Sequence, residues 1–146
     1  IKELKSKFHL TCENSNLITF SSGAQIAIDL LENYKLPIKS IGLMGGSIEL
    51  NKWYEFNNLS GLTKNDFVLK LNKIKRNYPE LFFIVRHGSE DVDMPIEEAK
   101  IWSDIINKTP FEVDFKTVDR MHHEIMWTKA CDDFFEIVNR ENKFFK

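Results

Sequence analysis

Short apolar runs alternate along the chain with segments whose apolar residues recur at helical spacing. The apolar runs predict β-strands at residues 17–20, 38–44, 81–86 and 111–118. The helical spacing predicts α-helices at residues 3–12, 22–34, 66–77, 96–107 and about 128–143. A strand–helix alternation of this kind predicts an α/β fold, in which a parallel sheet of about four strands carries helices on both faces.

The apolar spacing also predicts which face of each helix packs inward. In the helix at 22–34, the residues expected to share that face are Ile26, Ala27, Leu30, Leu31 and Tyr34. In the last helix, the expected stripe consists of Cys131, Phe134, Phe135 and Val138. Residues 47–65 have no clear period, and we interpret them as an excursion over the surface that carries Trp53, Tyr54 and Phe56.

Reactive side chains follow three of the four predicted strands. The strands end near Ser21, near Gly45, at 87–91 and at 119–123. Ligand sites in parallel sheets lie at the carboxyl ends of the strands, so these positions define a candidate site. Ser, Asp and His follow one another there in chain order, and together they provide a nucleophile, a base and a group that orients the base.

Each of these residues also has a structural interpretation. Ser21 or Ser22 could cap the helix that follows. Asp91 could hold a turn or cap the helix near residue 96, and His123 could be a surface or structural histidine. We interpret His87 as structural, shaping the turn after its strand. The functional interpretation depends on all three side chains falling at successive strand ends.

Three segments sharpen this picture, beginning with "ITFSSGAQIAI" at residues 18–28. This segment resembles the nucleophile elbow, G-x-S-x-G, of the α/β-hydrolases. The resemblance implies that Ser21 is the nucleophile and that the backbone N–H of Ser22 forms half of an oxyanion hole. Thr19 occupies the position of the first glycine, where small residues are usual because the backbone is strained and crowded.

The other motifs of the resemblance lie towards the carboxyl end of the chain. "FFIVRHGSEDVDMP" resembles the strand and turn that carry the acid of the family, which implies Asp91, with Glu90 and Asp93 as local rivals. "DRMHHEIMW" is similar to the Met-Gly-His-Glu run of carboxylesterases and thioesterases, which implies His123 as the base. His122 then stands at the glycine position. The 32 residues from acid to base leave room for one helix and one strand.

Composition fits one domain spanning residues 1–146, with 42% hydrophobic and 29% charged residues, and argues against disorder. The net charge of −2 shows no basic surplus, so we expect no nucleic-acid partner. No apolar run is long enough to span a membrane, and the charged first residues are unlike a secretory signal. Cys12 and Cys131 make no metal-type spacing, and either one long-range disulfide or two free thiols fits them, the thiols being favoured. We expect a cytoplasmic protein.

The resemblance covers nearly all of this chain but only the second half of a usual family domain. Four or more strands usually precede the nucleophile, whereas 20 residues precede Ser21 here. The strand at residues 17–20 would then have an unpaired edge, and the second oxyanion donor would be missing. The chain could be a fragment of a larger enzyme, or a reduced member that covers this edge with its first helix or by forming a homodimer. It could also be a subunit that another chain completes with an N-terminal segment. Its start at Ile1 favours the fragment.

These observations predict a serine hydrolase of an ester or thioester, with Ser21, His123 and Asp91 as its triad. Trp53, Tyr54 and Phe56 could cover an apolar acyl group. An acyltransferase with the same triad, or a hydrolase-like domain that only binds, are the alternatives. We expect no cofactor, and no metal either, because the histidines and carboxylates lack a third ligand at recognisable spacing.

Overall fold

The computed structural model describes residues 15–46, 63–123 and 126–144. The helix expected at residues 3–12 and the aromatic residues Trp53, Tyr54 and Phe56 lie outside these ranges. The fold and the candidate site are therefore described from the remaining elements.

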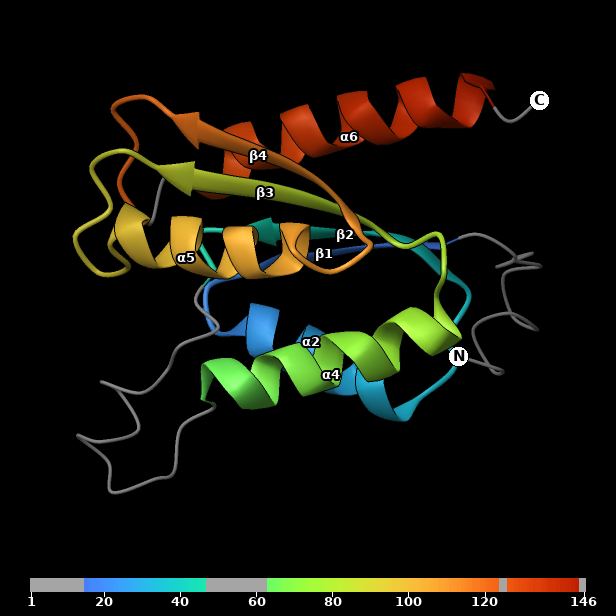
Figure 1. Cartoon of the computed structure of the whole chain (residues 1–146). Helices are drawn as coiled ribbons and strands as arrows, with labels where there is room; N and C mark the ends of the chain where they lie inside the picture. The colour runs from blue at the N-terminus through green and yellow to red at the C-terminus, as the bar shows by residue number, and fades with distance from the viewer. Residues whose placement is uncertain (1–14, 47–62, 124–125, 145–146) are drawn as a thin grey trace.

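Four parallel strands form one sheet in the order β1-β2-β3-β4 (Figure 1). Their bounds are Ser15–Phe20, Ile38–Met44, Phe82–Gly88 and Glu112–Val118. The middle strands are almost wholly buried, as expected for parallel strands that are covered on both faces. The α/β prediction is confirmed, and the strand order follows the chain order.

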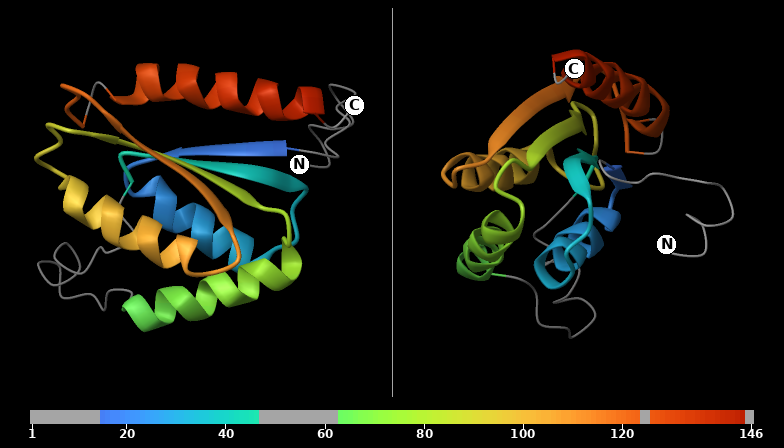
Figure 2. Two further views of the ribbon diagram at one scale, coloured as in Figure 1. Left: turned by 45° about the horizontal axis from the view of Figure 1, so that its top comes forward. Right: turned by 90° about the vertical axis from the view of Figure 1, so that its right-hand side faces the viewer.

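The helices form two layers on opposite faces of the sheet (Figures 1 and 2). The helix α6 (Met126–Phe144) covers one face. The other face carries three helices, which are α2 (Gly23–Asn33), α4 (Lys64–Asn77) and α5 (Ile96–Asn107). Each lies between two consecutive strands, as parallel connections require.

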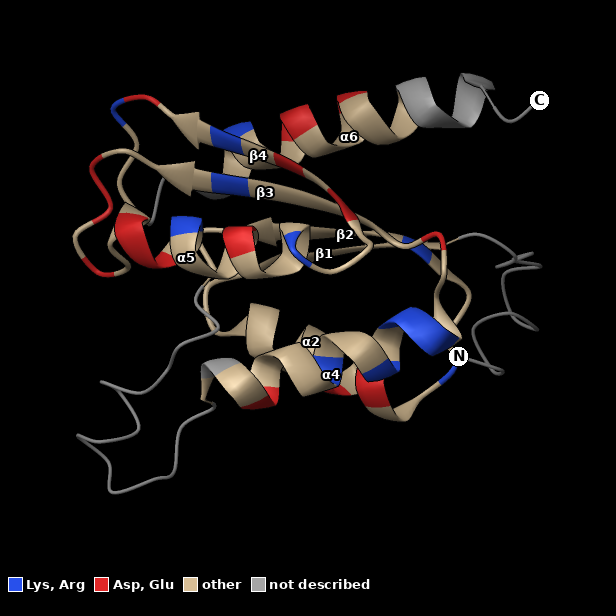
Figure 3. Ribbon diagram, viewed as in Figure 1, with Lys and Arg blue, Asp and Glu red and all other residues tan. Residues whose placement is uncertain are grey.

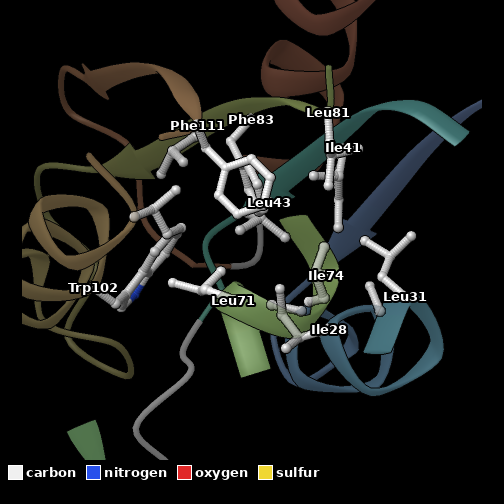
Figure 4. Close-up of a cluster of buried hydrophobic side chains, with 14 of the residues drawn as sticks. Ile28, Leu31, Ile41, Leu43, Leu71, Ile74, Leu81, Phe83, Trp102 and Phe111 are labelled. Carbon is white, nitrogen blue, oxygen red and sulfur yellow. The ribbon is translucent and has the colours of Figure 1, made fainter. Parts of the chain in front are cut away.

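The larger hydrophobic core fills the space between the sheet and these three helices (Figure 4). Trp102 of α5 is almost fully buried there, with the apolar side chains that α2, α4 and the strands turn inward. Figure 4 labels Ile28, Leu31, Ile41, Leu43, Leu71, Ile74, Leu81, Phe83 and Phe111 in this cluster. Burial of this apolar surface is the main force that holds the layers together.

The smaller core lies beneath α6. A Cβ on Gly42 would lie 2.6 Å from the ring of Phe134, so only glycine in β2 lets α6 pack so closely. The buried guanidinium of Arg86 in β3 pairs with Asp114 of β4 at 2.7 Å and also with Asp133 of α6. This pairing satisfies a buried cation, and it ties two strands and a helix to one another.

Two predicted helix faces are partly wrong, although Ala27 and Leu31 in the first and Phe134 and Val138 in the second are buried as predicted. In α2, Ile26, Leu30 and Tyr34 are exposed, and Ala24 and Ile28 are buried instead. In α6, the side chain of Phe135 is exposed as well. Both helices carry apolar residues on more than one face, and hydrophobic spacing cannot decide which of two apolar faces meets the sheet.

Within the described ranges, β1 has a partner strand on one side, β2. Its other edge therefore lies at the border of the sheet. None of the helices in these ranges is long and apolar enough to cross a membrane.

Candidate active site

The turn after β1 places Ser21 in an uncommon backbone conformation. Its φ is 52°, in the left-handed region that non-glycine residues rarely adopt. The backbone N–H of Ser21 donates to the carbonyl of Met44 at 3.1 Å, and its carbonyl accepts from Ala24 in the first turn of α2. The chain thus passes from strand to helix within two residues. Such strain is held at positions where the surroundings fix the backbone, and many of these positions are functional.

Three side chains from the ends of three strands meet at this edge of the sheet. Nε2 of His123 lies 3.0 Å from Oγ of Ser21, and Nδ1 of the same ring lies 2.8 Å from Oδ2 of Asp91. An ionised carboxylate accepts hydrogen bonds and cannot donate them, so Nδ1 of His123 carries the hydrogen. Nε2 is then left to accept from the serine hydroxyl. Residues up to 102 positions apart in the chain are joined in one line of hydrogen bonds.

Asp91 is the buried member of this group. Its side chain has no exposed surface, whereas that of His123 is 14% exposed. Its second oxygen, Oδ1, accepts from the backbone N–H of Met94 at 2.8 Å. Acidic side chains gather along the loop after β3 and in the first turn of α5 (Figure 3). Of the local rivals, Asp93 is exposed and Glu90 pairs with His122, so neither contacts His123.

The structural interpretation of Asp91 is therefore partly correct. The Met94 bond shows that Asp91 does hold its turn. It does not cap α5, because the residue at the N-cap is Pro95, with no side-chain cap bond. One carboxylate oxygen shapes the loop, and the other faces His123.

The loop after β3, residues 89–95, is called here the acid loop, and the loop after β4, residues 119–123, the histidine loop. Backbone hydrogen bonds join them directly. The N–H of Ser89 donates to Val118 at 3.0 Å, and that of Glu90 donates to Met121 at 3.1 Å. A third bond runs from the N–H of Arg120 to Oγ of Ser89. These three hydrogen bonds fix the position of the acid, Asp91, relative to the base, His123.

Gly88, the last residue of β3, lies directly against the histidine loop. A Cβ there would lie 2.2 Å from the carbonyl oxygen of Met121, a distance at which the backbone must move. We expect Gly88→Ala to destabilise the protein by about 1–3 kcal/mol, because overpacking forces the loops apart. Thermal unfolding measures this effect. Gly23→Ala is the control, since its Cβ would make an ordinary 3.6 Å contact. Equal melting temperatures for Gly88→Ala and the wild type would contradict the close approach.

Ser22 links Ser21 to the first residue of α2. It stands at the N-cap position of α2, as the structural interpretation expected, but its side chain makes no capping hydrogen bond. Within the described part of the chain, no acceptor for its backbone N–H is found. An N–H that is next to Ser21 and at the start of a helix suits a developing negative charge.

The two residues that depart from the family motifs are both accommodated. The hydroxyl of Thr19 donates to the carbonyl of Gly42 at 2.9 Å, and its Cβ leaves room for the chain at Gly23. His122 donates from Nδ1 to the carbonyl of Glu90 at 2.9 Å and is turned away from the site. Neither departure obstructs the line of hydrogen bonds.

The face of the imidazole ring is also supported. The ring of Phe20 lies 4.8 Å from that of His123, centroid to centroid. Gly45 has a φ of 53°, and a Cβ there would lie 3.4 Å from the ring of Phe20 and 3.5 Å from Nδ1 of the histidine. Phe20 and Gly45, at the ends of two adjacent strands, thus define the space that the ring occupies.

No rival site is found among the described residues. The pKa of the Cys131 thiol is raised, mainly by burial. A raised pKa lowers the fraction of this cysteine that is present as the nucleophilic thiolate. This cysteine is free of any disulfide. No three His, Cys, Asp or Glu side chains gather there as metal ligands. A cavity of about 390 Å³ lies at the opposite end of the strands, lined by Asn16, Ser40 and Phe82, so it does not open onto Ser21.

Comparison with known proteins gives a structural likeness and no sequence match. No protein-family model matches the chain, and no curated protein matches it by sequence. A carboxylesterase from Bacillus cereus is similar in structure, with a TM-score of 0.54 and 15% identity, over 88% of this chain and 51% of that one. Esterase PE8 is similar with a TM-score of 0.62 and 15% identity, over 95% and 55%.

An S-formylglutathione hydrolase from Agrobacterium tumefaciens gives a TM-score of 0.63 at 12% identity, over 91% of this chain and 51% of that one. The chain thus spans about half the length of these three structures. Four parallel strands, the strained turn after β1 and this likeness together show that the chain has the α/β-hydrolase fold and corresponds to its carboxyl-terminal half.

Proposed function

We propose that the protein is a serine hydrolase that cleaves an ester or thioester through an acyl-enzyme formed on Ser21. The observation that carries this proposal is the continuous line from Ser21 Oγ to His123 to Asp91, at 3.0 and 2.8 Å. Its support is geometric: nucleophile and base lie within hydrogen-bond reach, and a buried carboxylate orients the base. The structures it resembles include esterases and hydrolases, which agrees with this choice of reaction.

In the first half of the proposed reaction, Ser21 Oγ attacks the acyl carbon while Nε2 of His123 takes its proton. Asp91 keeps the other ring nitrogen hydrogen-bonded and stabilises the imidazolium that forms. The N–H of Ser22 donates to the oxyanion. The bond to the leaving alcohol or thiol then breaks, and His123 returns the proton to that leaving group.

In the second half, a water molecule replaces the serine hydroxyl as the nucleophile. His123 removes a proton from the water as it attacks the acyl-enzyme, the oxyanion re-forms, and Ser21 leaves with the proton from His123. We further propose that Trp53, Tyr54 and Phe56 cover the acyl group. We also propose that a segment outside this chain, or a second copy of it, supplies the second oxyanion donor and pairs with the edge of β1 that has no partner strand within the described ranges. Lack of one such donor costs about 10²–10³ in rate.

The test is a burst experiment on the natural full-length protein with p-nitrophenyl esters and a matched acyl thioester. We expect a burst of p-nitrophenol equal to the enzyme concentration, because acylation precedes the slower release of the acyl group. His123→Ala should abolish the burst. Adding an acceptor alcohol separates hydrolysis from acyl transfer, since a transferase would form the new ester in preference to the free acid. Absence of any burst or turnover with the whole series would contradict the proposal.

A further inference from the structure

A second histidine lies behind the acid, outside the line of hydrogen bonds described above. His87 is the penultimate residue of β3, and only 1% of its surface is exposed. Its Nδ1 is buried and has no hydrogen-bond partner among the described residues. A buried ring nitrogen without a hydrogen bond costs free energy of folding. The contacts of the other ring nitrogen, Nε2, must therefore account for the position of this ring.

Those contacts all lie in the acid loop. Nε2 of His87 donates to the carbonyl oxygen of Met94, since a carbonyl can only accept. The same nitrogen lies 3.6 Å from Oδ2 of Asp91. The backbone N–H of Met94 in turn donates to Oδ1 of Asp91. Met94 is therefore held at its carbonyl by His87, and it holds the acid with its N–H.

We propose that His87 is a positioning residue, which fixes Met94 so that the carboxylate of Asp91 keeps Oδ2 directed at His123. The expected effect of His87 on the rate rests on the proposed function. Its effect on the position of Asp91 does not. Without the bond from Nε2, the turn at Met94 is no longer anchored to β3. Asp91 can then rotate about its side-chain bonds, and the bond to His123 lengthens.

The two nitrogens of His87 permit a matched pair of substitutions. The amide nitrogen of a glutamine extends to about the position of Nε2, and that of an asparagine only to the position of Nδ1. His87→Gln therefore restores the donor to Met94, whereas His87→Asn places its amide where the histidine makes no hydrogen bond. Both variants are polar and uncharged, so a difference between them reports the position of the donor.

In ester hydrolysis by the full-length protein, we expect His87→Asn to lower kcat by about 10- to 100-fold, because small misplacements of catalytic groups cost rates of this size. KM should stay the same, because no substrate contact is removed. His87→Gln should recover most of kcat. Equal kcat values for the two variants, whether both high or both low, would overturn the proposal.

A second readout does not depend on activity. The Nδ1 proton of His123, hydrogen-bonded to Asp91, should give a far-downfield proton NMR signal in the wild type and in His87→Gln, and the signal should be lost in His87→Asn. If the wild type shows the signal but hydrolyses nothing, the proposed function fails while the positioning role is still tested. If His87→Asn does not fold, a folded His87→Gln protein without the signal overturns the proposal, and one that keeps it supports the proposal.

Discussion

Ser21→Ala is expected to lower kcat for ester hydrolysis by about 10⁴-fold or more, because removing the nucleophile removes the acyl-enzyme route altogether. The residual rate would come from binding and from the oxyanion donor alone. The fold should survive, since among the described residues the hydroxyl makes one hydrogen bond, to His123, and alanine meets the same backbone strain at this φ. Steady-state kinetics and circular dichroism measure the two effects.

A matched control lies at the other end of the same strand. Ser15→Ala changes a serine at the first residue of β1, remote from the site, and should leave kcat unchanged. If Ser21→Ala retained more than about a tenth of the wild-type rate, a loss this small would be inconsistent with covalent catalysis at this position.

Asp91→Asn is expected to lower kcat by about 10⁴-fold with little change in fold. The amide of an asparagine can donate to Nδ1 of His123, which favours the tautomer with the hydrogen on Nε2. That nitrogen then cannot accept the proton of Ser21. The size of the asparagine side chain is the same, so the buried space at Asp91 stays filled.

Asp93→Asn is the control for this change, because Asp93 lies in the same acid loop and is exposed. We expect it to keep the wild-type rate. The two variants together distinguish loss of the hydrogen bond to His123 from a general loss of negative charge in the loop. Equal activity of Asp91→Asn and Asp93→Asn would assign the role of the acid to another residue.

Much of the fold and the candidate site could be predicted because the pattern placed the carboxyl ends of the four strands to within two residues. The bounds of β2, Ile38–Met44, and of α5, Ile96–Asn107, agree with the prediction to the residue. Parallel strands bring their carboxyl ends to one edge, so Ser21, Asp91 and His123 could be expected to meet even though they are far apart in the chain.

The contacts that position these side chains could not be predicted, because they depend on the exact path of two loops. Nothing in the local sequence indicates that Gly88 passes next to Met121, or that His122 turns towards Glu90. The contact of His87 with the acid loop had one signal, a histidine directly after the apolar run at 81–86, but its partner is a backbone carbonyl that no sequence pattern marks.

The exposed face of α2 was missed for a different reason. Its apolar side chains form two stripes, and the stripe with Ile26, Leu30 and Tyr34 faces away from the sheet. Periodicity measures how apolar residues are spaced, and it contains no information on which neighbour a stripe meets.

The central claim is that Ser21 is a nucleophile activated by His123, and labelling with a fluorophosphonate tests it most directly. We expect the full-length protein to take up one label per chain, which fragmentation mass spectrometry should locate on Ser21 and not on Ser22. The label should be absent from Ser21→Ala and slow to form in His123→Ala. A label that persists in Ser21→Ala, or one found on another residue, would contradict the account.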